Sequence, residues 1–156
     1  MTKSKKQIEA KLAAFEQACR DAGLKLTHQR LEIYRELTCS TDHPSAETLY
    51  KRLQRQMPTL SLDTVYRTLA TFEDRDLIAR VETVESQARF EVQLERHHHF
   101  ICDRCHAIFD FVWEKFDEGC ARPTSLDKLG RVNSRNVIVR GVCRSCLKDE
   151  KVIHTA

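Results

Sequence analysis

The sequence predicts an α+β fold that is divided between a helical N-terminal part and a small α/β part containing strands. Four amphipathic helical patterns occupy the first part, and the last two are joined by only a few residues around Pro58. A pattern typical of a two-stranded hairpin follows directly, and two Cys-x-x-C pairs lie further along the chain. Together these observations predict a winged helix-turn-helix domain followed by a small α/β domain tied by a four-cysteine zinc site.

The composition is that of a globular protein rather than a disordered or membrane protein. Hydrophobic residues are 41% and charged residues 31%, as in ordinary globular proteins. No apolar run approaches the roughly 20 residues of a membrane span, and the N-terminus has no secretory apolar segment. We therefore expect a cytoplasmic protein without a membrane partner, in which the seven cysteines are thiols or metal ligands rather than disulfides. Cys19, Cys39 and Cys120 lie outside the pairs and are predicted to be small buried residues.

The first three helices are predicted over 6–22, after Thr27, and after Ser45 as far as Pro58. A fourth begins after its cap Ser61. Its apolar side chains are expected to face the core, namely Leu62, Val65, Leu69 and Phe72. Its polar face is expected to comprise Thr64, Arg67, Thr68 and Thr71, with Tyr66 at the edge. Such a face suits the major groove of DNA, although an ordinary solvated face is an equal alternative from this helix alone.

The hairpin is predicted from strands at 77–84 and 89–92, joined by a turn at 85–88. A hairpin placed directly after a helix-turn-helix is a wing, which favours DNA binding. Phe90 and Val92 should share one face, so Glu91 should point the other way.

The second part is rich in potential metal ligands. Strands are expected at Phe100-Ile101, at 107–113 and around Val137 to Val139, and 114–128 should open as a helix that is interrupted near Pro123. The interval between Cys105 and Cys143 exceeds the usual 15–20 residues of a zinc ribbon, so it has room for these elements. An exposed strand edge here would be a natural dimer surface.

His97 and His99 are two residues apart on a predicted strand, so they should face the same side and could share a second metal. A solvated strand edge is the alternative. A metal-dependent hydrolase would also use such a pair, but it would leave the winged helix unexplained. A zinc-stabilised DNA-binding module without sensing is a third possibility.

The chain resembles the ferric uptake regulator family of metal-responsive bacterial repressors between about residues 22 and 146. The resemblance is carried by GLKLTHQR at 23–30, HPSAE at 43–47, TVYR at 64–67, RFE at 89–91, HHH at 97–99, CDRC at 102–105 and CRSC at 143–146. It implies a non-enzymatic, metal-dependent repressor that binds palindromic operator DNA as a homodimer and has no small-molecule substrate. The implied domains are a DNA-binding domain at 1–92, a hinge at 93–96 and a dimerisation domain at 97–156.

The resemblance also implies roles for individual residues. A structural Zn²⁺ would be bound by Cys102, Cys105, Cys143 and Cys146. A regulatory metal, Fe²⁺ or Mn²⁺ with Zn²⁺ as a possible substitute, would be bound by His43, Glu91, His97, His99 and Asp110. DNA would be contacted by Lys25, Tyr66 and Arg67, beside Thr64 on the same helix.

The branch of the family is open at this point. Glu91 and Arg67 favour an iron sensor, whereas Asp110 favours a peroxide sensor, and a zinc-uptake regulator is a further alternative. Arg96 and Arg135 stand where some iron sensors have histidines, which argues against a third metal site. His98 and Asp117 are then expected to be surface residues.

Overall fold

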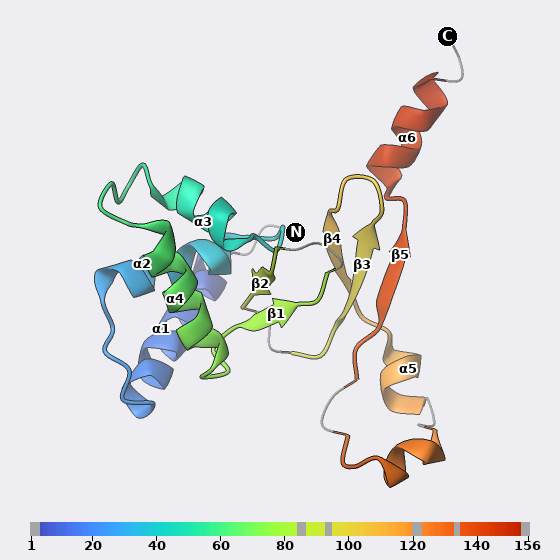
Figure 1. The fold of residues 1–156 in the computed structure, drawn as a ribbon, viewed down its shortest axis with the longest axis horizontal. Helices are drawn as coiled ribbons and strands as arrows, with labels where there is room; N and C mark the ends of the chain where they lie inside the picture. The colour runs from blue at the N-terminus through green and yellow to red at the C-terminus, as the bar shows by residue number, and fades with distance from the viewer. Residues whose placement is uncertain (1–3, 84–86, 93–94, 120–122, 133–134, 154–156) are drawn as a thin grey trace. The chain divides into compact units, whose positions relative to one another are not determined.

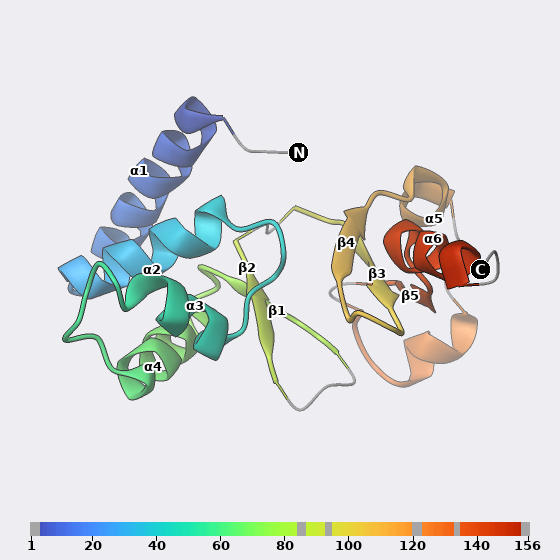
Figure 2. The same ribbon diagram turned by 90° about the horizontal axis from the view of Figure 1, so that it is seen from above.

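A computed structural model of the chain describes residues 4–83, 87–92, 95–119, 123–132 and 135–153. The chain forms two compact units, Met1–Leu94 (unit 1) and Glu95–Ala156 (unit 2). Figures 1 and 2 show the elements of each unit from two directions. The predicted turn at 85–88 and the predicted hinge at 93–96 fall partly outside the described residues, and Cys120 falls wholly outside them.

Unit 1 contains four helices and a hairpin, as predicted. The predicted caps Thr27, Ser45 and Ser61 each accept a backbone hydrogen bond in the first turn of their helix, and Ser4 does the same for the first helix. A cap of this kind stabilises a helix by about 1 kcal/mol. The helices are α1 (Lys5–Asp21), α2 (His28–Cys39), α3 (Ala46–Leu53) and α4 (Leu62–Glu73).

The third helix is shorter than predicted. It ends at Leu53 rather than at Pro58, and the chain turns before Met57. A residue that precedes proline is disfavoured in helical geometry, so the chain leaves the helix before that point. Met57 and Leu60 are nevertheless buried, so the connection between α3 and α4 packs on the core.

The core of unit 1 lies between its helices. The Phe15 ring stacks on Tyr34 at a centroid distance of 3.7 Å and meets the edge of Phe72 at 5.1 Å. On α4, Val65, Leu69 and Phe72 are buried as predicted. Thr68 was predicted to face solvent, and this is wrong: it is buried at 5% exposure, because it lies three residues after Val65 and four before Phe72 on the same stripe.

The wing is a short antiparallel pair of strands, β1 (Ala79–Val81) and β2 (Arg89–Glu91). Both strands are shorter than the predicted ranges. Phe90 and Val92 are buried as expected. The Phe90 N–H donates to the Pro44 carbonyl at 3.2 Å, which fastens β2 to the loop between α2 and α3.

Unit 2 is built on a three-stranded mixed sheet in the order β4-β3-β5. The central strand pairs antiparallel with β4 and parallel with β5, and the parallel connection runs through α5 and a 3₁₀ turn. The predicted interruption near Pro123 is confirmed, whereas the final helix was not anticipated. The elements are β3 (His98–Cys102), β4 (Ile108–Phe111), α5 (Glu114–Gly119), the 3₁₀ turn (Thr124–Lys128), β5 (Ile138–Gly141) and α6 (Arg144–Ile153).

The two described cysteines outside the Cys-x-x-C pairs differ in burial. Cys19 is buried as expected. Cys39 is exposed, contrary to the prediction, because it lies at the last position of α2 and away from the face that carries Leu37. Within the described residues, none of the helices has the length and apolar character needed to cross a membrane.

Candidate metal centres and nucleic-acid interface

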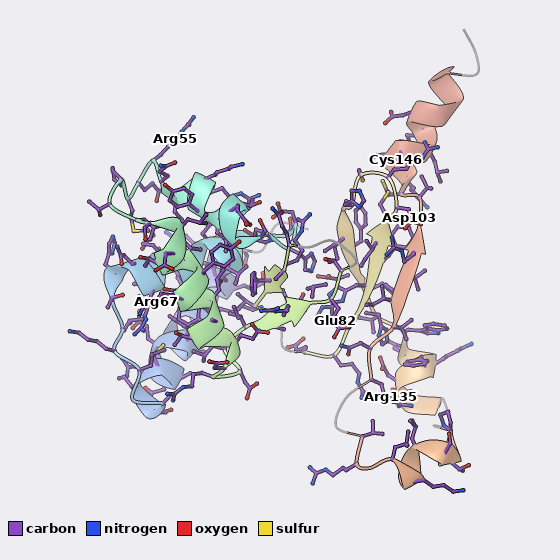
Figure 3. The ribbon with its side chains drawn as sticks, viewed as in Figure 1. Arg55, Arg67, Glu82, Asp103, Arg135 and Cys146 are labelled. Atoms are coloured by element: carbon purple, nitrogen blue, oxygen red, sulfur yellow. The ribbon has the colours of Figure 1, made fainter. Side chains whose placement is uncertain are left out.

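Four cysteines converge at one end of the sheet of unit 2. Cys102 ends β3, Cys105 lies in the following turn, Cys143 follows β5 and Cys146 lies in the first turn of α6 (Figure 3 labels Cys146). Their four sulfur atoms lie within 4.8 Å of one another. The Sγ separations are 3.9 Å between Cys102 and Cys146 and 3.7 Å between Cys105 and Cys143. Zinc–sulfur bonds of about 2.3 Å in a tetrahedron require an Sγ–Sγ edge of about 3.8 Å, so the four thiolates fit Zn²⁺.

The electrostatics of this cluster also suit a cation. Backbone N–H groups of Cys105 and Cys143 hydrogen-bond Cys102 and lower its pKa to about 6. Hydrogen bonding with the Cys143 sulfur, and then with that of Cys105, raises the pKa of Cys146 to about 12. Four thiolates at these separations repel one another, so they can all be ionised together only around a positive charge.

A second cluster lies on the β3–β4 pair of unit 2. His97 and His99 are both buried, and their Nε2 atoms lie 3.0 Å apart. The Oδ1 atom of Asp110, which pairs with His99 across the strands, lies 3.6 Å from His99 Nε2 and 3.9 Å from His97 Nε2. Two ligands about 2.1 Å from one ion and at right angles to each other would be separated by about 3.0 Å, so the histidine pair fits a single metal ion.

The tautomer of His97 supports the same conclusion. Its Nδ1 atom lies 2.7 Å from the backbone carbonyl of Glu95. A carbonyl can only accept, so Nδ1 carries the proton and the neutral ring presents its Nε2 lone pair to the cluster. Histidine ligands of metals are held in this way, with the second nitrogen donating to a carbonyl or carboxylate.

Unit 1 contributes a buried histidine–carboxylate pair. His43 Nε2 lies 3.1 Å from Glu91 Oε2, and both side chains are at most 9% exposed. His43 stands in the loop between α2 and α3 with φ of 48°, a left-handed conformation that non-glycine residues rarely adopt. Glu91 lies on β2, on the face opposite Phe90, as predicted.

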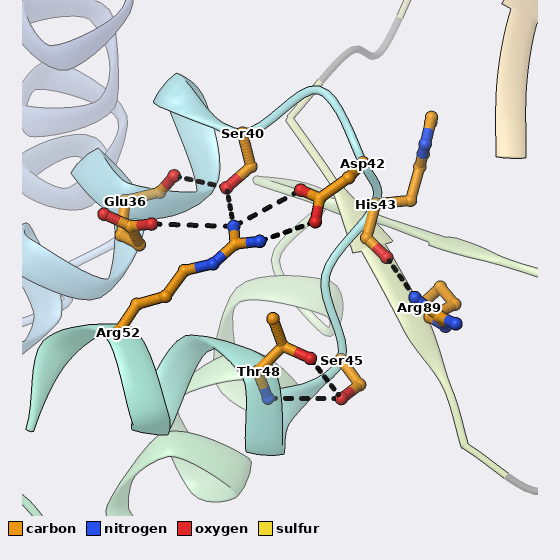
Figure 4. Close-up of polar contacts among 8 residues, drawn as sticks. All are labelled: Glu36, Ser40, Asp42, His43, Ser45, Thr48, Arg52 and Arg89. Atoms are coloured by element: carbon orange, nitrogen blue, oxygen red, sulfur yellow. Dashed lines mark hydrogen bonds and ion pairs between the residues drawn. The ribbon is translucent and has the colours of Figure 1, made fainter. Parts of the chain in front are cut away.

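The loop that carries His43 is fixed from both sides (Figure 4). Arg52 on α3 donates to Ser40 Oγ at 3.0 Å and to Asp42 Oδ2 at 2.6 Å. Burial acts to raise the pKa of Asp42, but the hydrogen bond and charge of Arg52 together outweigh it, and the pKa is lowered. On the other side, Arg89 donates to the His43 carbonyl at 3.3 Å. The sequence did not indicate that Arg52 and Arg89 hold this loop, because neither belongs to a pattern of spacing that predicts a contact with it.

Helix α4 presents a cationic and aromatic face. The Arg67 side chain is 82% exposed (Figure 3), and its contact with Asp63 spans 3.8 Å on the same helix. Tyr66 is also exposed, and its hydroxyl donates to Glu47 on α3. Thr64 is half-buried, and its hydroxyl lies 2.8 Å from that of the cap Ser61.

Lys25, the remaining predicted DNA contact, is exposed in the connection between α1 and α2. Its backbone carbonyl accepts a hydrogen bond from Arg30 Nη1 at 2.5 Å. The side chains of Lys25 and Arg67 therefore both lie in solvent.

The prediction that His98 is a surface residue is wrong. Its side chain is fully buried, because the alternation that turns His97 and His99 to one face turns His98 to the other, which α5 covers. Asp117 on α5 is 13% exposed and lies 3.4 Å from His98 and 3.5 Å from Arg96. Arg135 donates to the Asp117 carbonyl at 3.2 Å.

Comparison with known proteins agrees with this geometry. The model of the ferric uptake regulator family matches residues 21–124. The peroxide-responsive repressor PerR of Staphylococcus epidermidis is 32% identical over 133 residues, which cover 83% of this chain and 86% of that protein.

Two solved structures show the same fold. The ferric uptake regulator Fur of Helicobacter pylori, described with three functional metal binding sites, has a TM-score of 0.71 at 25% identity, covering 90% of this chain and 93% of that one. The ferric uptake regulator of Francisella tularensis, solved with iron, has a TM-score of 0.65 at 27% identity, covering 80% and 96%. With its four-cysteine cluster, its winged helix and a family match over about two thirds of its length, the chain belongs to the ferric uptake regulator family.

Proposed function

We propose that this chain is a metal-dependent repressor that binds palindromic operator DNA as a dimer when a regulatory metal, Fe²⁺ in the first instance, is bound. The observation that carries the proposal is the buried His97/His99 pair, whose Nε2 atoms lie 3.0 Å apart beside the Asp110 carboxylate. We assign the regulatory metal to these three residues together with His43 and Glu91 of unit 1.

The two metal sites differ in chemistry, and this difference supports different roles. Cys102, Cys105, Cys143 and Cys146 form an all-thiolate set with tetrahedral spacing, which suits permanent zinc. The second set offers only imidazole nitrogen and carboxylate oxygen. Such ligands suit Fe²⁺ or Mn²⁺, and they bind these ions weakly enough for occupancy to follow the concentration of metal in the cell. Zinc can substitute in the same ligand set.

DNA binding is assigned to unit 1. Arg67 and Tyr66 project from α4 into solvent, and Arg67 has the five donors needed to contact guanine bidentately in the major groove. Thr64 lies on the same helix, and we assign Lys25, which is exposed, to a contact in the minor groove. The wing formed by β1 and β2 completes the arrangement.

Dimerisation is assigned to unit 2. In the described sheet, β5 pairs on one side only, with β3, and its Ile138 and Val139 are 41% and 38% exposed. An unpaired strand edge with apolar side chains is the kind of surface that a second copy of the chain covers. A twofold dimer then explains a palindromic operator.

The metal dependence follows from linkage. Ligands drawn from both units would restrain one unit against the other, and the restrained arrangement binds DNA better than the free one. Occupancy of the site and affinity for DNA are then coupled, and each raises the other by the same factor.

A peroxide-sensing repressor is the second candidate. It is favoured by the match to the peroxide-responsive repressor of Staphylococcus epidermidis and by Asp110 among the ligands. In that case, iron bound at the same residues would promote oxidation of a ligand histidine, and the repressor would release DNA.

The test is DNA binding by anaerobic protein titrated with Fe²⁺, Mn²⁺ and Zn²⁺, before and after addition of peroxide. The probe is a duplex selected from a randomised library on the metal-loaded protein. An iron sensor binds with added metal and tolerates brief exposure to peroxide, whereas a peroxide sensor loses binding only in the iron-loaded form. Equal affinity with and without metal would instead identify a constitutive DNA-binding module, and ester or phosphate turnover that tracks the His97/His99 metal would identify a hydrolase.

A further inference from the structure

A third cluster of polar side chains in unit 2 lies on the face of the sheet opposite the histidine pair. It consists of Arg96, His98, Asp117 and Arg135, all of which belong to unit 2. His98 is fully buried between the rings of Phe111 and Phe116, each at a centroid distance of 5.4 Å. A fully buried imidazole beside a carboxylate is costly unless its polar atoms are matched, so the cluster calls for a role.

One hydrogen bond from the backbone fixes the tautomer of His98. The backbone N–H of Val137 donates to His98 Nδ1 at 3.2 Å. Nδ1 is therefore the acceptor, and in the neutral ring the proton is on Nε2, which faces Asp117 Oδ2 at 3.4 Å. The other oxygen of Asp117 lies 3.5 Å from Arg96 Nη1. Asp117 therefore interacts with two residues of one extended segment, each by one of its oxygens.

Arg135 holds Asp117 from the far side. Its Nη2 donates to the Asp117 carbonyl at 3.2 Å, and its guanidinium carbon lies 5.4 Å from the centre of the Phe116 ring. Figure 3 labels Arg135 in the segment that leads into β5. The cluster thus joins α5 and the chain before β5 to the start of β3, and its fixed positive charges are two guanidinium groups.

Strand alternation connects this cluster to the histidine pair. Arg96 and His98 are two residues apart, as are His97 and His99, so fixing the first pair against α5 directs the second pair to the opposite face. On that face, His99 pairs with Asp110 and His97 is anchored by the Glu95 carbonyl. A shift of Asp117 would therefore be transmitted to the Nε2 atoms of His97 and His99 through the backbone of the strand.

We propose that Asp117 is a positioning residue for the regulatory metal, holding Arg96 and His98 against α5 so that His97 and His99 present their Nε2 atoms at ligand spacing. This inference rests on the proposed function, because it takes these two histidines as ligands. The guanidinium group of Arg96 lies 3.5 Å from one Asp117 oxygen and offsets the charge of this carboxylate, whose side chain is 13% exposed.

The experiment compares Asp117→Asn with Glu118→Gln. Glu118 is an exposed acid of the same helix, so its replacement removes the same charge without touching the cluster. Zinc-loaded protein is titrated anaerobically with Mn²⁺, and bound metal is counted per chain. Asp117→Asn should weaken Mn²⁺ binding by about ten- to hundredfold, the usual effect of losing a group that orients metal ligands. Glu118→Gln should bind Mn²⁺ as the unchanged protein does.

A readout on Mn²⁺-free protein separates positioning from general damage. Long-range ¹H–¹⁵N spectra report which imidazole nitrogen carries the proton. In the unchanged protein, His97 should be protonated on Nδ1 and His98 on Nε2. In Asp117→Asn, His97 should lose its single tautomer as its ring moves away from the Glu95 carbonyl, whereas His98 should keep its proton on Nε2 because the Val137 N–H still donates to Nδ1. Zinc content should stay at one ion per chain, and the helical circular dichroism should be retained.

A second variant keeps the test decisive if Asp117→Asn fails to fold. Arg96→Met changes a side chain that is 45% exposed, and it should weaken Mn²⁺ binding in the same direction. Where both variants fold, the double variant should bind Mn²⁺ no more weakly than Asp117→Asn alone, because both substitutions remove the same contact between Arg96 and Asp117.

Three results would overturn the proposal or its basis, and they are distinguishable. If the unchanged protein binds no second ion, the proposed function itself fails. If it binds Mn²⁺ and Asp117→Asn binds equally well, only the positioning role fails. If Asp117→Asn lowers the number of ions bound per chain by one while the remaining Mn²⁺ affinity is unchanged, then His98 and Asp117 are metal ligands rather than supports.

Discussion

Replacing Cys102 by Ser is expected to remove the zinc and unfold unit 2 while unit 1 stays folded. In the described part of unit 2, the buried aliphatic side chains are Ile101 and Ile108. Their burial stabilises the unit by roughly 3–6 kcal/mol together. Binding of zinc by four ligands contributes about 10–16 kcal/mol in small domains, so the metal stabilises unit 2 more than its buried aliphatic side chains do. The free energy lost with one thiolate and the zinc ion should therefore exceed the stabilisation that the apolar core supplies.

The assay combines native mass spectrometry for zinc with amide hydrogen exchange. In Cys102→Ser, amides of β3 and β5 should exchange at rates typical of an unfolded chain, and the dimer should dissociate in sedimentation. Amides of α2 and α4 should remain protected, because unit 1 has its own aromatic and aliphatic core. The matched control is Cys39→Ser, which changes an exposed thiol of α2 and should leave every measurement unaltered. Slow exchange across β3 and β5 in a zinc-free Cys102→Ser protein would refute the reasoning.

Three further outcomes are expected. His97→Ala should keep its zinc and fold but lose metal-dependent DNA binding in fluorescence anisotropy, and an undiminished response to Mn²⁺ would exclude His97 from the site. Arg67→Ala should weaken binding to the selected duplex by about 1–3 kcal/mol and to unrelated DNA far less. The comparison is Arg55→Ala, an exposed arginine in the turn that follows α3, and equal losses on both duplexes in Arg67→Ala would argue against base recognition. Arg52→Met should destabilise unit 1 by under about 1 kcal/mol at neutral pH in urea denaturation, because its pair with Asp42 is half exposed. The pKa of Asp42 is lowered in the folded state, so this contribution is present above the ordinary aspartate pKa and is lost as the pH falls through the lowered value; a difference that persists in strong acid would contradict the assignment.

Much of the fold could be predicted from local patterns. Thr27, Ser45 and Ser61 mark helix starts because a cap is a local interaction between a side chain and the following turn. The stripe of Val65, Leu69 and Phe72 specifies which face of α4 is buried. The same periodicity, applied strictly, would also have placed Thr68 in the core, and its polar character misled the prediction.

The metal centres could be predicted only in part. The two Cys-x-x-C pairs can be recognised in the sequence, because each short spacing suits neighbouring ligands of one ion. The strand period likewise indicates that His97 and His99 share a face. Neither pattern shows that His98 would be fully buried, since its environment comes from α5 and from the segment before β5.

The sequence by itself determined where the helices of unit 1 begin, the wing, the cysteine pairs and the shared face of the two histidines, because each depends on neighbours only a few residues apart. The tertiary structure decided which polar residues support these features. Arg52 reaches Asp42 across a loop, Arg89 reaches the His43 carbonyl, and Asp117 lies against Arg96 and His98. These contacts join residues far apart along the chain, and their partners are fixed only when helices and strands pack, so no local period encodes them.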